Sequence, residues 1–111
     1  MVGVPKQDEI WLISLDPTKK GAEIRKTRPC VIVSPDDLNR YLQTVIVAPM
    51  TTVPRRYPTR VPILHAGKTG EIVLDQLRAV DRQRLVRRFG RITQKTAENV
   101  SSVLLELFAR R

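Results

Sequence analysis

An arginine followed by a proline, Arg28-Pro29, introduces an apolar stretch that runs from Cys30 to Ser34. Proline fixes its own φ angle and biases the residue before it toward an extended backbone. Arg28 is therefore expected to be held rigidly at the start of a core strand. Two interpretations are open: an ordinary solvated side chain, or a fixed cation directed at an anion.

Further polar residues stand beside other predicted strands. Glu23 lies in the polar segment before Arg28, and Thr51 and Thr52 follow the apolar stretch Thr44–Ala48. A third set follows the next buried stretch and comprises Asp75, Gln76, Arg78 and Asp81. In a small barrel, residues just beyond the strand ends can converge on one rim. Each of them taken alone could equally be a solvated surface residue.

The chain is strongly basic. Its 20 lysines and arginines against 11 aspartates and glutamates give a net charge of +9. Nucleic acid, an acidic protein or an anionic membrane surface are the natural partners of such a chain. The arginines between positions 78 and 91 could contact phosphates or only solubilise one face. No apolar run approaches the roughly 20 residues of a membrane span, and no signal sequence is recognisable, so we expect a cytoplasmic protein without a membrane partner.

Few residues are candidates for metal or nucleophilic chemistry. The single cysteine, Cys30, lies in an apolar stretch and is expected to pack in the core. No Cys/His cluster is present, so neither a metal site nor a metal cofactor is expected. The single histidine, His65, lies near a predicted turn and is expected to be a surface or packing residue. Residues 66–69 (AGKT) resemble the end of a P-loop but lack its first glycine, so nucleotide binding is not expected.

Short apolar, β-branched stretches separated by turn residues predict a mainly β chain. The predicted strands are Glu9–Leu15, Cys30–Ser34, Thr44–Ala48, Thr59–Leu64, Glu71–Asp75 and Arg87–Ile92. Residues 16–27 and the basic segment Met50–Pro58 are predicted loops, Ala66–Thr69 is a predicted turn, and Gln76–Leu85 is predicted to be short and irregular. Pro62 marks its strand as an edge or a bulge, and Gly90 marks a bulge or a close approach.

The C-terminal segment has the periodicity of an amphipathic helix. From Gln94 to about Ala109, apolar residues recur at helical spacing at Ala97, Val100, Leu104, Leu107 and Phe108, and Thr93 is the predicted N-cap. A short helical turn through about Leu42 is predicted with Ser34 as its N-cap. With 111 residues, the chain is predicted to form one domain, a small bent sheet or barrel with the last helix packed on it.

The order of the motifs is specific. EIWLISLDPTKKGAEIRKTRPCVIVSPDDLNR is followed by VIVAPMTT, then by DQLRAVDRQRL and the terminal helix. This order, from about Glu9 to about Phe108, resembles the MazF/PemK/Kid family of toxin endoribonucleases, most specifically in DPTKKGAEIRKTRP and VAPMT. The resemblance implies a small SH3-like or CcdB-like barrel that forms a homodimer. It also implies the toxin of a type II toxin–antitoxin pair, inhibited by a cognate antitoxin, that cleaves single-stranded RNA at short sequences without metal.

The resemblance also implies roles for particular residues. Arg28 falls on the family's catalytic arginine, Thr51 on its active-site threonine, and Glu23 on the glutamate of its Gly-x-Glu element. Glu23 is the preferred proton acceptor, with Asp75 second. The expected RNA-binding residues are Thr52, Arg55, Arg56, Tyr57, Asp75, Gln76 and Arg78, of which the loop residues are assigned from position and type. Attack by the RNA 2′-hydroxyl would give 2′,3′-cyclic phosphate and 5′-hydroxyl ends.

Three departures from the family pattern keep alternatives open. Asp8 stands where the family often has glycine, Val73 replaces an arginine found in some members, and the first loop lacks the histidine that some members use for proton transfer. CcdB-like proteins use the same barrel to poison DNA gyrase through their terminal helix. A basic RNA-binding module without catalysis is a further alternative.

Overall fold

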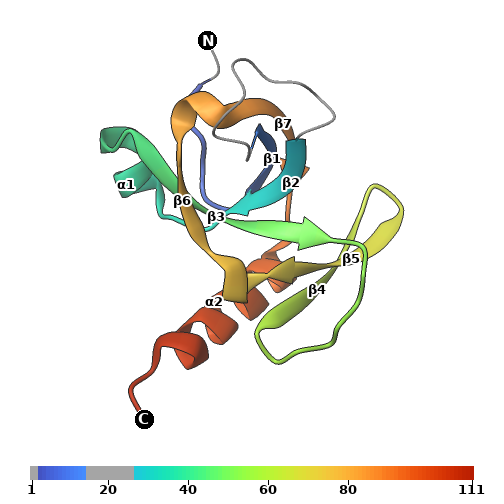
Figure 1. Cartoon of the computed structure of the whole chain (residues 1–111). Coiled ribbons are helices and arrows are strands. Elements are labelled where there is room, and N and C mark those ends of the chain that lie inside the picture. The colour runs from blue at the N-terminus through green and yellow to red at the C-terminus, as the bar shows by residue number, and fades with distance from the viewer. Residues whose placement is uncertain (1–2, 15–26) are drawn as a thin grey trace.

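The computed structural model describes residues 3–14 and 27–111 of the chain. Within them, seven antiparallel strands form one curled, half-barrel sheet followed by a C-terminal helix (Figure 1). The sheet order is β4-β5-β3-β2-β1-β7, and β6 also pairs with β3. The elements are β1 (Glu9–Ser14), β2 (Thr27–Ile32), α1 (Asp36–Tyr41), β3 (Thr44–Thr51), β4 (Arg60–His65), β5 (Lys68–Val73), η2 (Leu74–Gln76), β6 (Arg78–Asp81), η3 (Arg82–Arg84), β7 (Leu85–Arg91) and α2 (Gln94–Phe108).

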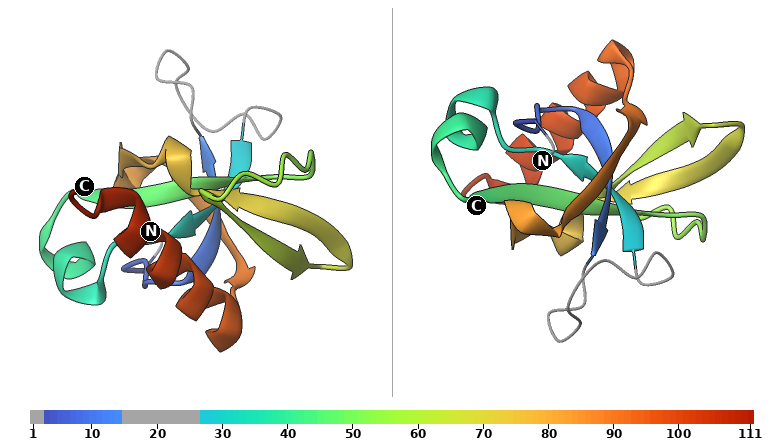
Figure 2. Two further views of the ribbon diagram at one scale, coloured as in Figure 1. Left: turned by 90° about the horizontal axis from the view of Figure 1, so that it is seen from below. Right: turned by 90° about the horizontal axis from the view of Figure 1, so that it is seen from above.

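Strand β3 is the central element because three other strands pair with successive parts of it. Residues 44–47 pair with β6, residues 47–49 with β2, and residues 50–51 with β5. The hairpin of β4 and β5 projects from the sheet on the side away from α1 (Figure 2). Strand β4 is an edge strand, which confirms the prediction made from Pro62 and explains why the missing N–H is tolerated there.

The uninterrupted apolar character of the central strands follows from burial of both faces of the sheet. Successive side chains of a strand point to opposite faces. Ile10 and Val31 join one core cluster, whereas their neighbours Trp11 and Cys30 join the other. The first cluster is covered by α2, and the second is closed by Val80 of β6 and Leu85 of β7. Curling of the sheet thus protects a second apolar face without a second layer of helices.

The predicted terminal helix is present and is capped as expected. The Thr93 hydroxyl oxygen accepts a hydrogen bond from the Thr96 amide at 3.2 Å. Val100 is buried against the first core cluster, and Ala97, Val103 and Leu104 pack beside it. The end of the helix does not continue this contact, since the Phe108 side chain is 68% exposed. The helix therefore covers the sheet mainly with its first three turns.

Several predicted boundaries are wrong for one physical reason. Arg28 and Pro29 lie inside β2, paired with β1, and Lys68 and Thr69 belong to β5. The segment predicted to be irregular contains β6, which is completed by pairing with β3. Local sequence does not record such long-range pairing. The segment 15–26, including Glu23, lies outside the described residues.

The predicted N-cap role of Ser34 is also wrong. Helix α1 begins after Pro35 without a side-chain cap. Ser34 instead donates its hydroxyl proton to Asn39 Oδ1 at 2.6 Å and accepts the Ile46 amide at 3.0 Å. The Asn39 side chain, which is fully buried, returns a hydrogen bond to the Ser34 carbonyl at 2.9 Å. This buried network ties α1 to β3.

We expect Asn39→Ala to destabilise the protein by about 1–3 kcal/mol, because it leaves buried polar groups of Ser34 without their partners. Urea unfolding followed by circular dichroism measures the change. Asn99→Ala, an exposed residue of α2, is the control and is expected to have a much smaller effect. Equal stability of the Asn39→Ala and wild-type proteins would contradict a structural role for this network.

Two backbone positions explain features of the sequence. Asp8 has a φ of 75°, in the left-handed region that favours glycine, which accounts for the glycine often found there in the resembled family. Gly90 has a φ of 143° and lies at a register shift between β1 and β7. A Cβ atom on Gly90 would lie 2.7 Å from Cε1 of His65, so both features predicted for this glycine are confirmed.

Candidate active site

An open cleft of about 510 Å³ lies between the end of β3, the β4–β5 hairpin and the strands β2 and β7. Its polar side chains come from four strands and the loop after β3: Arg28, Thr51, Thr52, His65, Lys68 and Thr69. Leu12, Met50 and Phe89 contribute apolar surface. The structure therefore brings Arg28 together with Thr51 and Thr52, whereas none of the third predicted group, Asp75, Gln76, Arg78 and Asp81, lines this cleft.

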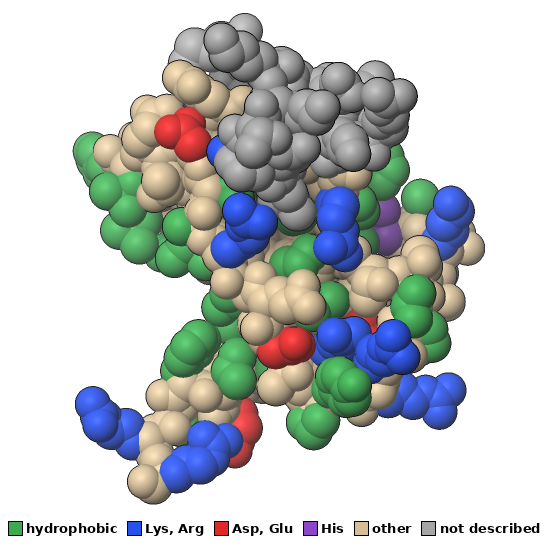
Figure 3. Space-filling model, viewed as in Figure 1, with side chains coloured by type: hydrophobic (Ala, Val, Ile, Leu, Met, Phe, Trp, Pro, Cys, Tyr) green, Lys and Arg blue, Asp and Glu red, His purple; other side chains and the backbone are tan. Residues whose placement is uncertain are grey.

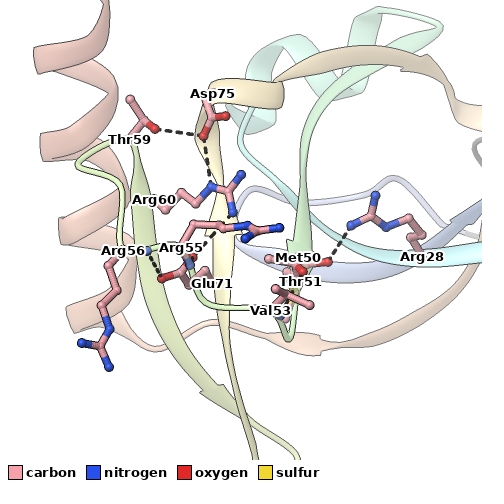
Figure 4. A network of polar contacts seen from close by, with 10 residues as sticks. All are labelled: Arg28, Met50, Thr51, Val53, Arg55, Arg56, Thr59, Arg60, Glu71 and Asp75. Atoms are coloured by element: carbon pink, nitrogen blue, oxygen red, sulfur yellow. Dashed lines mark hydrogen bonds and ion pairs between the residues drawn. The ribbon is translucent and has the colours of Figure 1, made fainter.

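Arg28 is exposed on β2 but is not free to swing. Its Nη2 atom donates a hydrogen bond to the Met50 carbonyl at 3.1 Å (Figure 4). This bond joins β2 to the C-terminal end of β3. Pro29 restrains the backbone of the same residue. A guanidinium has five N–H donors, so this single bond leaves most of them available to an anion. This hydrogen bond agrees with the fixed-cation interpretation of Arg28, which stays a prediction.

Thr51 is oriented by the turn that it begins. Its hydroxyl oxygen accepts a hydrogen bond from the Val53 amide at 3.1 Å. Because the oxygen is used as an acceptor, the hydroxyl proton remains available for donation. Thr51 and Arg28 can thus both donate to an anionic group bound in the cleft.

The basic loop after Thr51 is anchored by a buried carboxylate that the sequence analysis missed. Glu71 on β5 is 6% exposed and accepts the backbone amides of Arg55 and Arg56, each at 3.0 Å. Arg60 lies 3.7 Å from the same carboxylate. In Figure 4 the Arg55 side chain extends from this network toward the strand of Thr51, whereas Arg56 points away. Glu71 therefore fixes the backbone from which both arginines project.

The hydrogen bonds to Glu71 predict a pH-dependent contribution to stability. The backbone N–H of Arg55 is the largest cause of the lowered pKa of Glu71, whose ordinary value is 4.5, and Arg56 and Arg60 act in the same direction. A carboxylate with a lowered folded-state pKa stabilises the fold above its unfolded pKa, and that contribution is lost as the pH falls through the folded pKa.

We therefore expect Glu71→Gln to lower the unfolding free energy most at pH values above 4.5 and progressively less below that value. Urea unfolding at several pH values between about 3 and 7 measures the difference. Glu106→Gln, an exposed glutamate of α2, is the control. A Glu71→Gln effect of the same size at all pH values would contradict the electrostatic origin.

Asp75 lies in the Glu71 network and outside the cleft of Arg28. It accepts the Thr59 hydroxyl at 2.9 Å, and Arg60 Nε lies 3.5 Å from it (Figure 4). The Arg60 guanidinium also lies 4.9 Å from the Tyr57 ring centroid and covers one face of that ring. Asp75 is thus engaged with Arg60, and Tyr57, which is 52% exposed, keeps part of its surface for a partner.

A second hollow of about 460 Å³ adjoins the cleft. It includes Arg56, Tyr57 and Arg60, and it shares Thr52, Thr69 and Gly70 with the cleft. Three of the predicted RNA-binding residues, Thr52, Arg56 and Tyr57, therefore border one continuous depression. Gln76 in η2 and Arg78 on β6 border neither hollow.

Two residues that line the cleft, His65 and Lys68, were not among the predicted site residues. His65, expected to be a surface or packing residue, ends β4 and lines the cleft. Lys68, its partner across the hairpin, contributes a second cation. The signal in the sequence was their position at the predicted turn, but only the folded hairpin places both residues on the lining of the cleft that contains Arg28.

Three further findings concern Cys30, metal binding and membrane-spanning helices. Cys30 is fully buried, as predicted, and burial raises the pKa of its thiol to about 12, so it is not a nucleophile. Among residues 3–14 and 27–111, no group of three or more His, Cys, Asp or Glu side chains could hold a metal ion. In the same residues, no helix is long and apolar enough to cross a membrane.

The fold and the cleft define a class of small, basic half-barrels with an arginine presented at an open, cationic depression. On the face seen in Figure 3, lysine and arginine side chains are widespread and acidic ones are few. Such a surface suits an anionic partner. The family model described as PemK-like, MazF-like toxin of type II toxin–antitoxin system matches residues 6–108.

Curated relatives agree with this match. The chain is 33% identical to the endoribonuclease PemK of Escherichia coli, over 90% of this chain and 76% of that protein. It is 30% identical to the endoribonuclease MazF of Staphylococcus saprophyticus, over 89% of this chain and 87% of that protein. The chain therefore belongs to the PemK-like, MazF-like toxins of type II toxin–antitoxin systems.

Solved structures of low sequence identity share the fold. A MazE–MazF structure from Deinococcus radiodurans has a TM-score of 0.79 at 20% identity, covering 99% of this chain and 100% of that one. An endoribonuclease from a mycobacterial species has a TM-score of 0.77 at 22% identity, covering 94% and 90%. The predicted fold class, a small MazF/PemK-type β fold with a C-terminal helix, is confirmed.

Proposed function

We propose that this chain is the toxin of a type II toxin–antitoxin pair and acts as an endoribonuclease on single-stranded RNA, with Arg28 and Thr51 at the reacting phosphate. The observation that carries the proposal is the cleft in which an oriented guanidinium and an oriented hydroxyl face the same space. The curated relatives named endoribonucleases support the reaction class.

The chemistry requires little of the protein beyond placing donors and moving protons. The 2′-hydroxyl of the RNA attacks the adjacent phosphorus, the bond to the 5′-oxygen breaks, and the products carry 2′,3′-cyclic phosphate and 5′-hydroxyl ends. Negative charge accumulates on the phosphoryl oxygens in the transition state. Arg28 can bind two of these oxygens through its planar fork, and Thr51 can donate its hydroxyl proton to the same group.

The basic loop and second hollow extend the proposed RNA site. Glu71 fixes the backbone amides of Arg55 and Arg56. Arg56 and Tyr57 line the second hollow, which shares Thr52 with the cleft. Arginine and tyrosine side chains recognise unstacked bases by stacking and hydrogen bonding. We assign base selection to this loop, and phosphate contact to Arg78. Asp75 and Gln76 remain predicted RNA-binding residues.

The remaining parts of the proposal concern partners and location. A net charge of +9 suits an acidic, partly disordered antitoxin that competes for the RNA surface. The similar structure from Deinococcus radiodurans is of a MazE–MazF pair, which supports a protein partner for this chain. We further propose that the toxin acts on messenger RNA in the cytoplasm, as a homodimer and without a metal cofactor.

Two other functions predict different results. A CcdB-like gyrase poison would act through the terminal helix and leave RNA intact. A non-catalytic RNA-binding module would bind RNA in a salt-sensitive manner without cutting it. The family match favours the endoribonuclease over both alternatives.

The deciding experiment incubates purified protein with long single-stranded RNA in the presence of EDTA and sequences the cut ends. Cuts at one short motif, with 5′-hydroxyl ends, are expected. Intact RNA bound in a salt-sensitive manner would identify the binding module. Intact RNA together with gyrase inhibition would identify the gyrase poison. Cleavage that stops in EDTA would contradict the metal-independent mechanism.

A further inference from the structure

Among the described residues that line the cleft, His65 is the one whose side chain is of a type that commonly accepts protons in catalysis. It lines the cleft that contains Arg28 and Thr51, and no aspartate or glutamate of the described residues does so. The other ionisable cleft side chains, Arg28 and Lys68, are cations in their ordinary states. Imidazole is the side chain most often used for proton transfer in catalysis.

Strand β7 holds the imidazole in a defined orientation. His65 Nε2 lies 3.3 Å from the Phe89 carbonyl oxygen, and the two rings are 5.4 Å apart between centroids. A carbonyl oxygen can only accept, so a neutral imidazole in this contact carries its proton on Nε2 and its lone pair on Nδ1. Within residues 3–14 and 27–111, Nδ1 has no hydrogen-bond partner. The basic nitrogen is therefore the one left available to a substrate.

The space occupied by the imidazole depends on Gly90. A Cβ atom at this position would lie 2.7 Å from Cε1 and 3.3 Å from Nε2 of His65. Any larger residue would push the ring out of its position against Phe89. The bulge at Gly90 and the histidine of β4 thus form one arrangement, although the two residues are 25 positions apart in the chain.

We propose that His65 is the general base of the RNA cleavage assigned above, an inference that rests on the proposed function. Nδ1 takes the proton of the 2′-hydroxyl as the new O2′–P bond forms and the bond from phosphorus to the 5′-oxygen breaks. The departing 5′-oxygen takes a proton from water. The imidazolium, whose Nε2–H donates to the Phe89 carbonyl, then returns its proton to solvent. This assignment differs from the preference for Glu23 drawn from the sequence, a residue that lies outside those the structure describes.

The first test removes the basic nitrogen and then restores it from solution. His65→Gln is expected to lower the single-turnover cleavage rate about 100-fold. Binding of a 2′-O-methyl RNA of the cut sequence, which cannot react, is expected to remain unchanged. His65→Ala is expected to be slow in the same way and to regain activity as free imidazole is added. A merely structural histidine would give neither unchanged binding nor rescue.

The second test uses the glycine that makes room for the ring. Gly90→Ala is expected to slow cleavage in the wild-type background and to cause no further loss in the His65→Ala background. Gly67→Ala is the matched control, because Gly67 also has a positive φ, of 76°, but has no atom within 4 Å of an added Cβ. It is expected to leave cleavage unchanged, which separates backbone strain from displacement of the imidazole.

The outcomes distinguish this inference from the proposed function. A wild-type rate in His65→Gln, or a His65→Ala protein that imidazole does not reactivate, would overturn the role of His65. In either case cleavage by the wild type and its loss in Arg28→Ala would leave the endoribonuclease assignment intact. A wild-type protein that cuts no RNA would overturn the proposed function itself and, with it, this inference.

Discussion

Arg28→Ala is expected to abolish detectable RNA cleavage while the protein remains folded. Removing one oriented donor from a developing oxyanion typically costs about 3–4 kcal/mol of transition-state stabilisation, or about 100- to 1,000-fold in rate. The fold should tolerate the change because the side chain is exposed and makes one hydrogen bond, to the Met50 carbonyl. Single-turnover cleavage and circular dichroism measure the two effects.

Arg28→Lys sharpens this expectation. Lysine keeps the positive charge but presents a point charge on a flexible stem in place of a planar fork. We expect the lysine variant to bind RNA and to cleave it nearly as poorly as the alanine variant. Arg40→Ala, which removes an exposed arginine that pairs with Asp37 on α1, is the charge-matched control and should cleave normally. Substantial cleavage by a folded Arg28→Ala protein would show that the guanidinium does not act on the reacting phosphate.

A change in the RNA substrate is expected to reduce cleavage as strongly as the Arg28→Ala substitution. Replacing the single ribonucleotide on the 5′ side of the cut with its 2′-deoxy analogue is expected to abolish cleavage at that position, because the nucleophile is the RNA's own 2′-hydroxyl. Binding should change little, since phosphate contacts supply most of the affinity. An RNA oligonucleotide with the cut motif, and a copy with this one substitution, are compared by electrophoresis after incubation with the same protein.

A deoxy substitution one nucleotide further along is the matched control and should leave cleavage in place. The end groups give a second criterion. A 2′,3′-cyclic phosphate and a 5′-hydroxyl are expected, whereas cleavage of the deoxy-substituted site with a 5′-phosphate product would require water as the nucleophile. Such a product would contradict the assignment of Arg28 and Thr51 to an intramolecular transfer.

Much of the fold could be predicted from the sequence because local patterns reflect local physics. The alternation and β-branching of residues 10–14 and 44–48 predicted strands, and the spacing from Ala97 to Leu104 predicted the helix that Thr93 caps. Boundaries failed where pairing at long range decided the outcome, as for β6, whose four residues form a strand because β3 lies beside them. Ser34 was misassigned because its buried partner, Asn39, is not visible in a capping pattern.

Some features of the candidate site could also be predicted from the sequence, whereas others depend on the tertiary structure. The order of motifs predicted the family. The expected convergence on one rim holds for Arg28, Thr51 and Thr52, which line one cleft, and fails for Asp75, Gln76, Arg78 and Asp81, which do not. Sequence alone could not place His65 in their cleft, nor show that Glu71 fixes the arginine loop, since both depend on how the β4–β5 hairpin folds over β3 and β7. Types and order along the chain are encoded locally, whereas the convergence of side chains is decided by strand pairing and a single bulge at Gly90.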